Sequence, residues 1–162
     1  MLTREGVYDI LGTVMDPEVP VISVVELGII RDAVVDGDRV TLTITPTYSG
    51  CPAMREIESD CRAALLDAGA SEVVVNTVYA PAWTTDWIGP EAREKLRAYG
   101  IAPPGNAEQG GLITLTRRRA AVVCPFCGSG DTELKSEFGS TACKAIHVCK
   151  ACRQPFDEFK AL

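Results

Sequence analysis

Two Cys-x-x-Cys pairs near the end of the chain constrain its fold more than any other feature. The pairs are Cys124–Cys127 and Cys149–Cys152, separated by 21 residues. Two thiolates spaced by two residues can chelate one metal from a tight turn, and two such turns complete a tetrahedral sulfur shell. About 40 residues cannot bury much apolar surface, so a metal would supply the folding energy that this segment lacks. We therefore expect a zinc-ribbon-like domain over residues 120–162.

The closed sulfur shell favours a structural metal over a catalytic one. Four thiolates leave no open coordination position for a substrate, so structural zinc is expected, with a single iron as the main alternative. Cys143 and His147, the only histidine, lie between the pairs and are surplus to four ligands. Cys143 stays a supporting candidate, and His147 is expected at the surface. A thiol–disulfide oxidoreductase is a weaker interpretation, because one metal explains two matched pairs better.

Cys51 is the second chemical candidate, and it lies where a strand pattern gives way to a helix pattern. Residues 40–45 alternate between apolar side chains and threonines, which is typical of a strand with one buried face. Residues 52–68 repeat apolar side chains at three- and four-residue steps, which predicts an amphipathic helix that ends before Gly69. Cys61 falls on the apolar stripe and is expected in the core.

This pattern places Cys51 at or next to the N-cap of the helix. Free N–H groups and the positive end of the helix dipole favour a thiolate there, which would be a nucleophile or a soft-metal ligand. A packed cap residue without chemistry is the alternative. Thr47 and Ser49 are candidate donors to the sulfur. Asp16 and Glu18, on a proline-rich loop, either approach the same pocket or serve as a capped, solvated turn.

The remaining patterns predict an α+β domain over residues 1–101, in which a small mixed sheet carries helices on one face. The expected elements are a helix over residues 3–14 with Thr3 as N-cap, a hairpin of 29–35 and 39–45 around Asp36-Gly37, a strand over 72–79, and a helix over 90–99 that ends at Gly100. The two tryptophans follow the last strand and either seal the helix over residues 90–99 against the sheet or form a partner-binding patch. Residues 102–119 are expected to be a linker and connecting segment, which includes the basic run Arg117–Arg119.

Composition argues against several classes of partner and site. A net charge of −6 and a pI near 4.8 provide no broad basic field for nucleic acid or an anionic membrane. The sequence shows neither a membrane-spanning apolar run nor the apolar core of a signal peptide, so we expect a cytosolic protein. No complete hydrolytic or nucleophilic triad can be assembled, so we do not expect an enzyme that acts on its own.

Several segments carry a resemblance to known families. Asp16-Pro-Glu-Val-Pro20, Glu26-Leu-Gly-Ile29, and Thr47 with Cys51-Pro52 resemble the iron–sulfur assembly domain of SufT-like proteins. Residues 45–53, 99–104 and 138–145 resemble the PaaD family, accessory subunits encoded with the phenylacetyl-CoA epoxidase of aerobic phenylacetate breakdown. SufT-like proteins lack the C-terminal ribbon, so the ribbon is what this chain adds.

The resemblance implies an accessory or maturation factor that assists assembly of an iron–sulfur or di-iron centre, with a structural subunit of the oxygenase as the alternative. The implied partners are the oxygenase subunits and the iron–sulfur reductase subunit, and a homodimer is a further expected arrangement. Cys51 matches the cysteine regarded as functional in the assembly domain, which implies transient binding of iron or an iron–sulfur cluster. One thiolate is too few for a stable cluster, so a second chain, a client cysteine or a small thiol would have to share it.

Overall fold

The computed structural model describes residues 1–105 and 121–162 and divides the chain into two compact units, Met1–Gly89 and Pro90–Leu162. The division falls earlier than the boundary expected after residue 101, because helix α3 (Pro90–Tyr99) groups with the second unit. Most of the expected linker, including Arg117–Arg119, lies outside the described residues.

A three-stranded mixed sheet forms the centre of the first unit. Strands β1 (Ile30–Asp36) and β2 (Arg39–Ile44) pair antiparallel, whereas β3 (Glu72–Thr77) pairs parallel with β2, so the strand order is β1-β2-β3. The predicted hairpin is confirmed, but its two-residue loop is Gly37-Asp38 rather than Asp36-Gly37, because Asp36 pairs with Arg39. Gly37 has φ +64°, and a glycine at the first loop position matches a type II′ hairpin turn.

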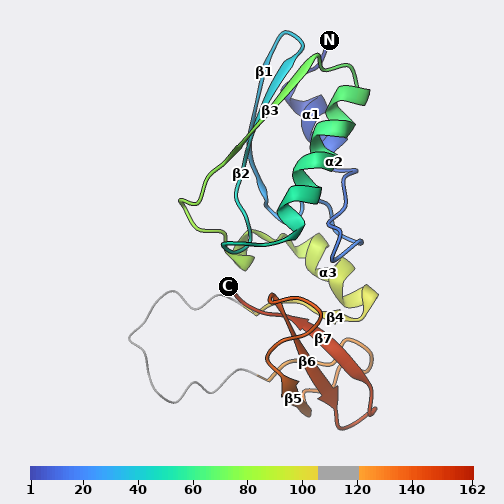
Figure 1. Ribbon diagram of the computed structural model, residues 1–162. Helices are drawn as coiled ribbons and strands as arrows, with labels where there is room; N and C mark the ends of the chain where they lie inside the picture. Colours follow the sequence, from blue (N-terminus) through green and yellow to red (C-terminus); the bar gives the residue numbers. More distant parts are fainter. Residues whose placement is uncertain (106–120) are drawn as a thin grey trace. The chain divides into compact units, whose positions relative to one another are not determined.

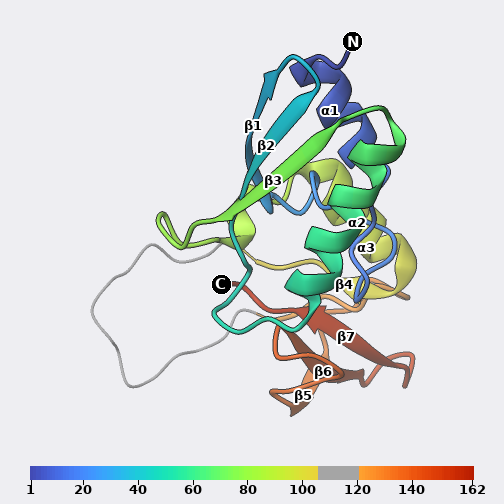
Figure 2. The same cartoon turned by 45° about the horizontal axis from the view of Figure 1, so that its top comes forward.

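Helices α1 (Arg4–Leu11) and α2 (Ala53–Asp67) lie on the same face of this sheet, as Figures 1 and 2 show. Burial follows the predicted alternation, because the apolar residues of β2 are buried beneath the helices and its threonines at 41 and 43 are only half-buried. Among the described residues, no helix combines the length and apolarity that crossing a membrane requires. The fold class predicted from the sequence is therefore confirmed for this unit.

The first helix keeps its predicted start but ends earlier than expected. The Thr3 hydroxyl accepts a hydrogen bond from the Gly6 N–H at 3.1 Å, which confirms the N-cap. The helix ends at Leu11 instead of residue 14, because the chain then turns to form a β-bridge between Met15 and Ser23.

The tryptophans pack within the first unit. Trp83 is buried, and its indole N–H donates to the Leu27 carbonyl at 2.9 Å. The Arg31 guanidinium lies 3.7 Å from the centroid of the Trp87 ring. Gly28, at φ +78°, could not carry a side chain, since its Cβ would lie 3.0 Å from Cβ of Trp87. Trp83 is therefore buried rather than part of an exposed patch, and the partner of its indole N–H is Leu27 of the first unit.

The second unit contains α3 and a four-stranded sheet of order β4-β7-β6-β5. Its strands are β4 (Ile101–Ala102), β5 (Thr132–Ser136), β6 (Lys144–Cys149) and β7 (Pro155–Phe159). The last three form an antiparallel ribbon, and β4 adds to β7 in parallel. The ribbon was predicted, whereas β4 lies where the sequence indicated the start of a linker.

Candidate functional site

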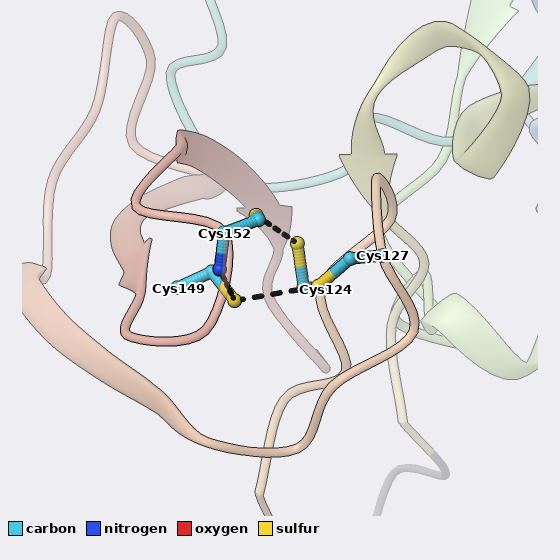
Figure 3. A group of neighbouring side chains, drawn as sticks. All are labelled: Cys124, Cys127, Cys149 and Cys152. Atoms are coloured by element: carbon cyan, nitrogen blue, oxygen red, sulfur yellow. Dashed lines mark hydrogen bonds between the residues drawn. The ribbon is translucent and has the colours of Figure 1, made fainter.

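The four cysteines of the two pairs converge on one point of the second unit. All four sulfurs lie within 4.8 Å of one another, with Sγ–Sγ distances of 3.7 Å for Cys124–Cys152 and 3.5 Å for Cys127–Cys149 (Figure 3). A tetrahedral shell with metal–sulfur bonds of about 2.3 Å places its sulfurs roughly 3.8 Å apart. The donor set and its spacing therefore fit a single tetrahedrally coordinated soft metal.

The backbone around the two pairs prepares the sulfurs for this arrangement. In the first turn, the Gly128 N–H donates to the Cys124 carbonyl at 2.9 Å, and Gly128 takes φ +75°. The N–H of Cys152 points at Cys149 Sγ at 3.5 Å, and this hydrogen bond lowers the pKa of the Cys149 thiol to about 7. The thiolate is the form that binds metal, so this hydrogen bond favours the ligating state of Cys149.

A small apolar cluster covers one side of the sulfur site. Cys124 and Cys149 are buried together with Ala102 of β4 and Phe156 of β7, while Cys127 remains exposed. Phe156 comes from the strand that follows the second pair, and Ala102 comes from the segment that follows α3. The site is therefore built from both ends of the second unit.

His147 is not at the surface, which corrects the expectation from the sequence. Its side chain is 4% exposed, Nε2 lies 2.7 Å from Oε2 of Glu158, and its ring stacks on Phe156 with centroids 5.5 Å apart. The paired register of β6 and β7 places His147 opposite Phe156, which turns the histidine into the core. Cys143 is also buried, with its Sγ 3.0 Å from the Thr141 hydroxyl, and it is not one of the clustered sulfurs.

Cys51 occupies the position that the sequence predicted. It immediately precedes Pro52, the N-cap of α2, and its side chain is half-buried. Gly50 takes φ +83° to bring the chain into the helix, and Gly69 follows the other end at φ +102°. Pro52 supplies no side-chain cap, so the first N–H groups of α2 depend on other acceptors; the Cys51 carbonyl accepts from the Met54 N–H at 3.3 Å.

The candidate supporting residues of Cys51 lie in two loops, Thr47 and Ser49 in its own loop and Asp16 and Glu18 in an earlier one. Within the described part of the chain, no hydrogen bond joins the side chains of Thr47 or Ser49 to the Cys51 sulfur. Asp16 is 6% exposed, and its Oδ1 accepts from the backbone N–H groups of Glu18 and Val19, both at 2.8 Å. Asp16 therefore caps a turn, as in the more ordinary of the two uses that the sequence left open, but its carboxylate is buried rather than solvated.

Replacing Asp16 with alanine should destabilise the first unit by about 1–3 kcal/mol, because the buried N–H of Val19 and the partly buried N–H of Glu18 would lose their acceptor. Urea unfolding followed by tryptophan fluorescence measures this directly, since both tryptophans lie in Met1–Gly89. Asp16→Asn keeps one carbonyl oxygen and should lose much less. Equal unfolding midpoints for Asp16→Ala and the native protein would contradict the capping role.

Cys61 of α2 and Cys51 of the loop before it should differ sharply in their rates of alkylation. Cys61 is 1% exposed, and burial raises the pKa of its thiol to about 12. Its thiolate is scarce at neutral pH, so iodoacetamide should modify Cys61 more slowly than the half-buried Cys51 by on the order of a hundredfold or more. Peptide mass spectrometry of the folded protein measures both rates. Comparable rates would mean that α2 opens readily or that Cys51 is shielded.

Sequence reasoning missed the contributions of β4 and Phe156 to the metal site. Ala102 stands before Pro103-Pro104-Gly105, and that composition indicated a linker. The one available signal was the apolar Ile101-Ala102 dipeptide, which is too short to show a strand period.

Comparisons with known proteins divide the chain in a similar way. Residues 4–77 match the family model of an iron–sulfur cluster assembly protein, and residues 108–160 match that of the PaaD zinc beta ribbon domain. The chain is 44% identical over 156 residues to an Escherichia coli K12 protein named as a putative subunit of 1,2-phenylacetyl-CoA epoxidase, and the match covers 96% of this chain and 92% of that protein.

Two further similarities concern the first part of the chain. An iron–sulfur protein maturation auxiliary factor of Porphyromonas gingivalis is 36% identical over 96 residues, covering 58% of this chain and 90% of that protein. The crystal structure of a DUF59 domain from Bacillus anthracis superposes with a TM-score of 0.54 at 30% identity, over 57% of this chain and 90% of the other.

Proposed function

The chain belongs to the PaaD family of phenylacetyl-CoA epoxidase subunits, and from this premise we propose that it is a maturation factor for the metal centres of that epoxidase. The observation that carries the proposal is the joining, in one chain, of an iron–sulfur assembly domain with a four-sulfur site. The assembly domain would handle the cluster, and the metal-bound ribbon would be a rigid module that docks on one client system.

Cys124, Cys127, Cys149 and Cys152 would hold one structural zinc. The buried positions of Cys124 and Cys149 and the four-thiolate donor set support this assignment, because such a shell is closed to substrate. A bound zinc would cross-link the two cysteine turns of the ribbon and would not act on a substrate.

Cys51 would act on the cargo. Its half-buried sulfur lies beside the N-terminus of α2, where it would share iron or an iron–sulfur cluster with a second thiol. A client cysteine, a small thiol or a second copy of this chain would supply that thiol. Thr47, Ser49, Asp16 and Glu18 would support Cys51 through the fold of their loops rather than as ligands.

The name of the E. coli relative favours a second candidate, a stoichiometric structural component of the oxygenase. Purification of the tagged epoxidase from cells with and without this chain separates the two. A maturation factor should be absent from the active complex, and its loss should leave the oxygenase and the iron–sulfur reductase low in iron. Restoring their iron in vitro should then restore activity without this chain. A complex that contains this chain at a fixed ratio and needs it for activity would favour the structural component.

A further inference from the structure

Ala102 shares the buried cluster of the metal site although it precedes the first cysteine pair by more than twenty positions. It is 1% exposed and belongs to one apolar cluster with Cys124, Cys149 and Phe156. Pairing with β7 fixes its place, since Ala102 lies opposite Glu158 and Ile101 opposite Asp157. A methyl group at this position therefore forms part of the wall behind the sulfurs.

A second contact between this segment and the metal site joins Gly100 to the turn of the first cysteine pair. Gly100 takes φ +93°, and a Cβ on it would lie 3.0 Å from Cζ and 3.1 Å from Cε1 of Phe126. Phe126 stands directly before Cys127, so its ring rests on the backbone that leaves α3. A side chain at residue 100 would have to displace that ring.

Other contacts also hold this segment, because Ile101 is buried and both residues of β4 pair with β7. Strand β4 is only two residues long, and the Arg93 side chain of α3 donates to the Pro104 carbonyl beyond it. Packing on the cysteine cluster and on Phe126 adds to these attachments and ties the segment to the metal site. Contacts that exist only in the folded, ligating form of the turn stabilise that form, and the metal must stabilise those contacts in return.

We propose that Gly100 and Ala102 are positioning residues of the metal site, so that the α3–β4 segment and the bound metal stabilise each other. The proposal rests on the metal assignment above. It extends the metal-holding unit to residues 100–102, upstream of the ribbon proper.

The test measures the rate at which the purified, zinc-loaded chain releases metal to an excess of a chromogenic chelator. Ala102→Val should release zinc about tenfold faster or more, the usual scale for residues that support metal ligands. Ala145→Val is the matched control, because Ala145 is equally buried on β6 of the same sheet but is not in the cysteine cluster. Equal acceleration in the two variants would overturn the positioning role of Ala102.

A double-mutant cycle tests Gly100 separately from backbone strain. Gly100→Ala should speed release in the native background and have a much smaller effect when Phe126→Ala has removed the ring. Equal effects in both backgrounds would trace the change to the positive φ and overturn the ring contact. A native chain that holds no metal would instead refute the assignment of the four ligands, so the two failures are distinguishable.

Discussion

Cys149→Ser is expected to release the metal and unfold the ribbon, while the first unit stays folded. Cys149 is fully buried among the sulfurs, and no other described side chain completes the shell. Structural zinc contributes on the order of 10 kcal/mol to the folding of zinc-finger peptides, more than so small a core can replace. Elemental analysis should fall from one zinc per chain to near zero, and amides of β6 and β7 should lose protection from hydrogen exchange.

The two units provide internal controls for this result. Tryptophan fluorescence should show an unchanged unfolding transition, because both tryptophans belong to Met1–Gly89. Cys143→Ala removes a buried thiol of the same domain that lies outside the cluster, and it should keep one zinc per chain. A Cys149→Ser protein that loses its zinc but keeps exchange protection would show that the ribbon folds on its apolar packing alone. A variant that retains one zinc per chain would show that Cys149 is not a required ligand.

The features of this fold that depend on local sequence patterns could be predicted from the sequence. The strand–loop–helix around Cys51 follows from local periodicity and from glycine and proline positions. Helix α2 lies where that pattern predicts and ends at Asp67, shortly before Gly69. The four-sulfur cluster follows from spacing, because a Cys-x-x-Cys turn brings two thiols together without reference to the rest of the fold.

What the sequence could not provide are contacts between distant segments. The burial of His147 depends on its register opposite Phe156, and the strand role of Ala102 depends on β7, more than fifty residues later. The hydrogen bonds of Asp16 are local, yet their burial depends on how the loop packs within the first unit. Composition at these positions indicated a surface, a linker and a solvated turn, and tertiary packing overrode each indication.

Cys51→Ser should leave both units folded and the ribbon zinc in place, yet lower phenylacetyl-CoA epoxidase activity in cells severalfold or more. Serine preserves the size of the half-buried side chain, but its hydroxyl does not ionise near neutral pH and is a poor ligand for iron. Epoxidase activity and client iron content should fall together in a strain that carries only the variant. Loss of activity with a fully iron-loaded client would contradict a role in cluster assembly.

Cys61→Ala provides the control for that experiment, since it removes the other cysteine of the same region from a buried position. It should cost about 1 kcal/mol of stability in the first unit through lost packing, and epoxidase activity should remain close to normal. If Cys51 is only a packed cap residue, both variants should support growth on phenylacetate equally well. A deficit confined to Cys51→Ser, with normal tryptophan unfolding and one zinc per chain, is the pattern that a cluster-handling thiol requires, because neither lost stability nor lost zinc could then account for it.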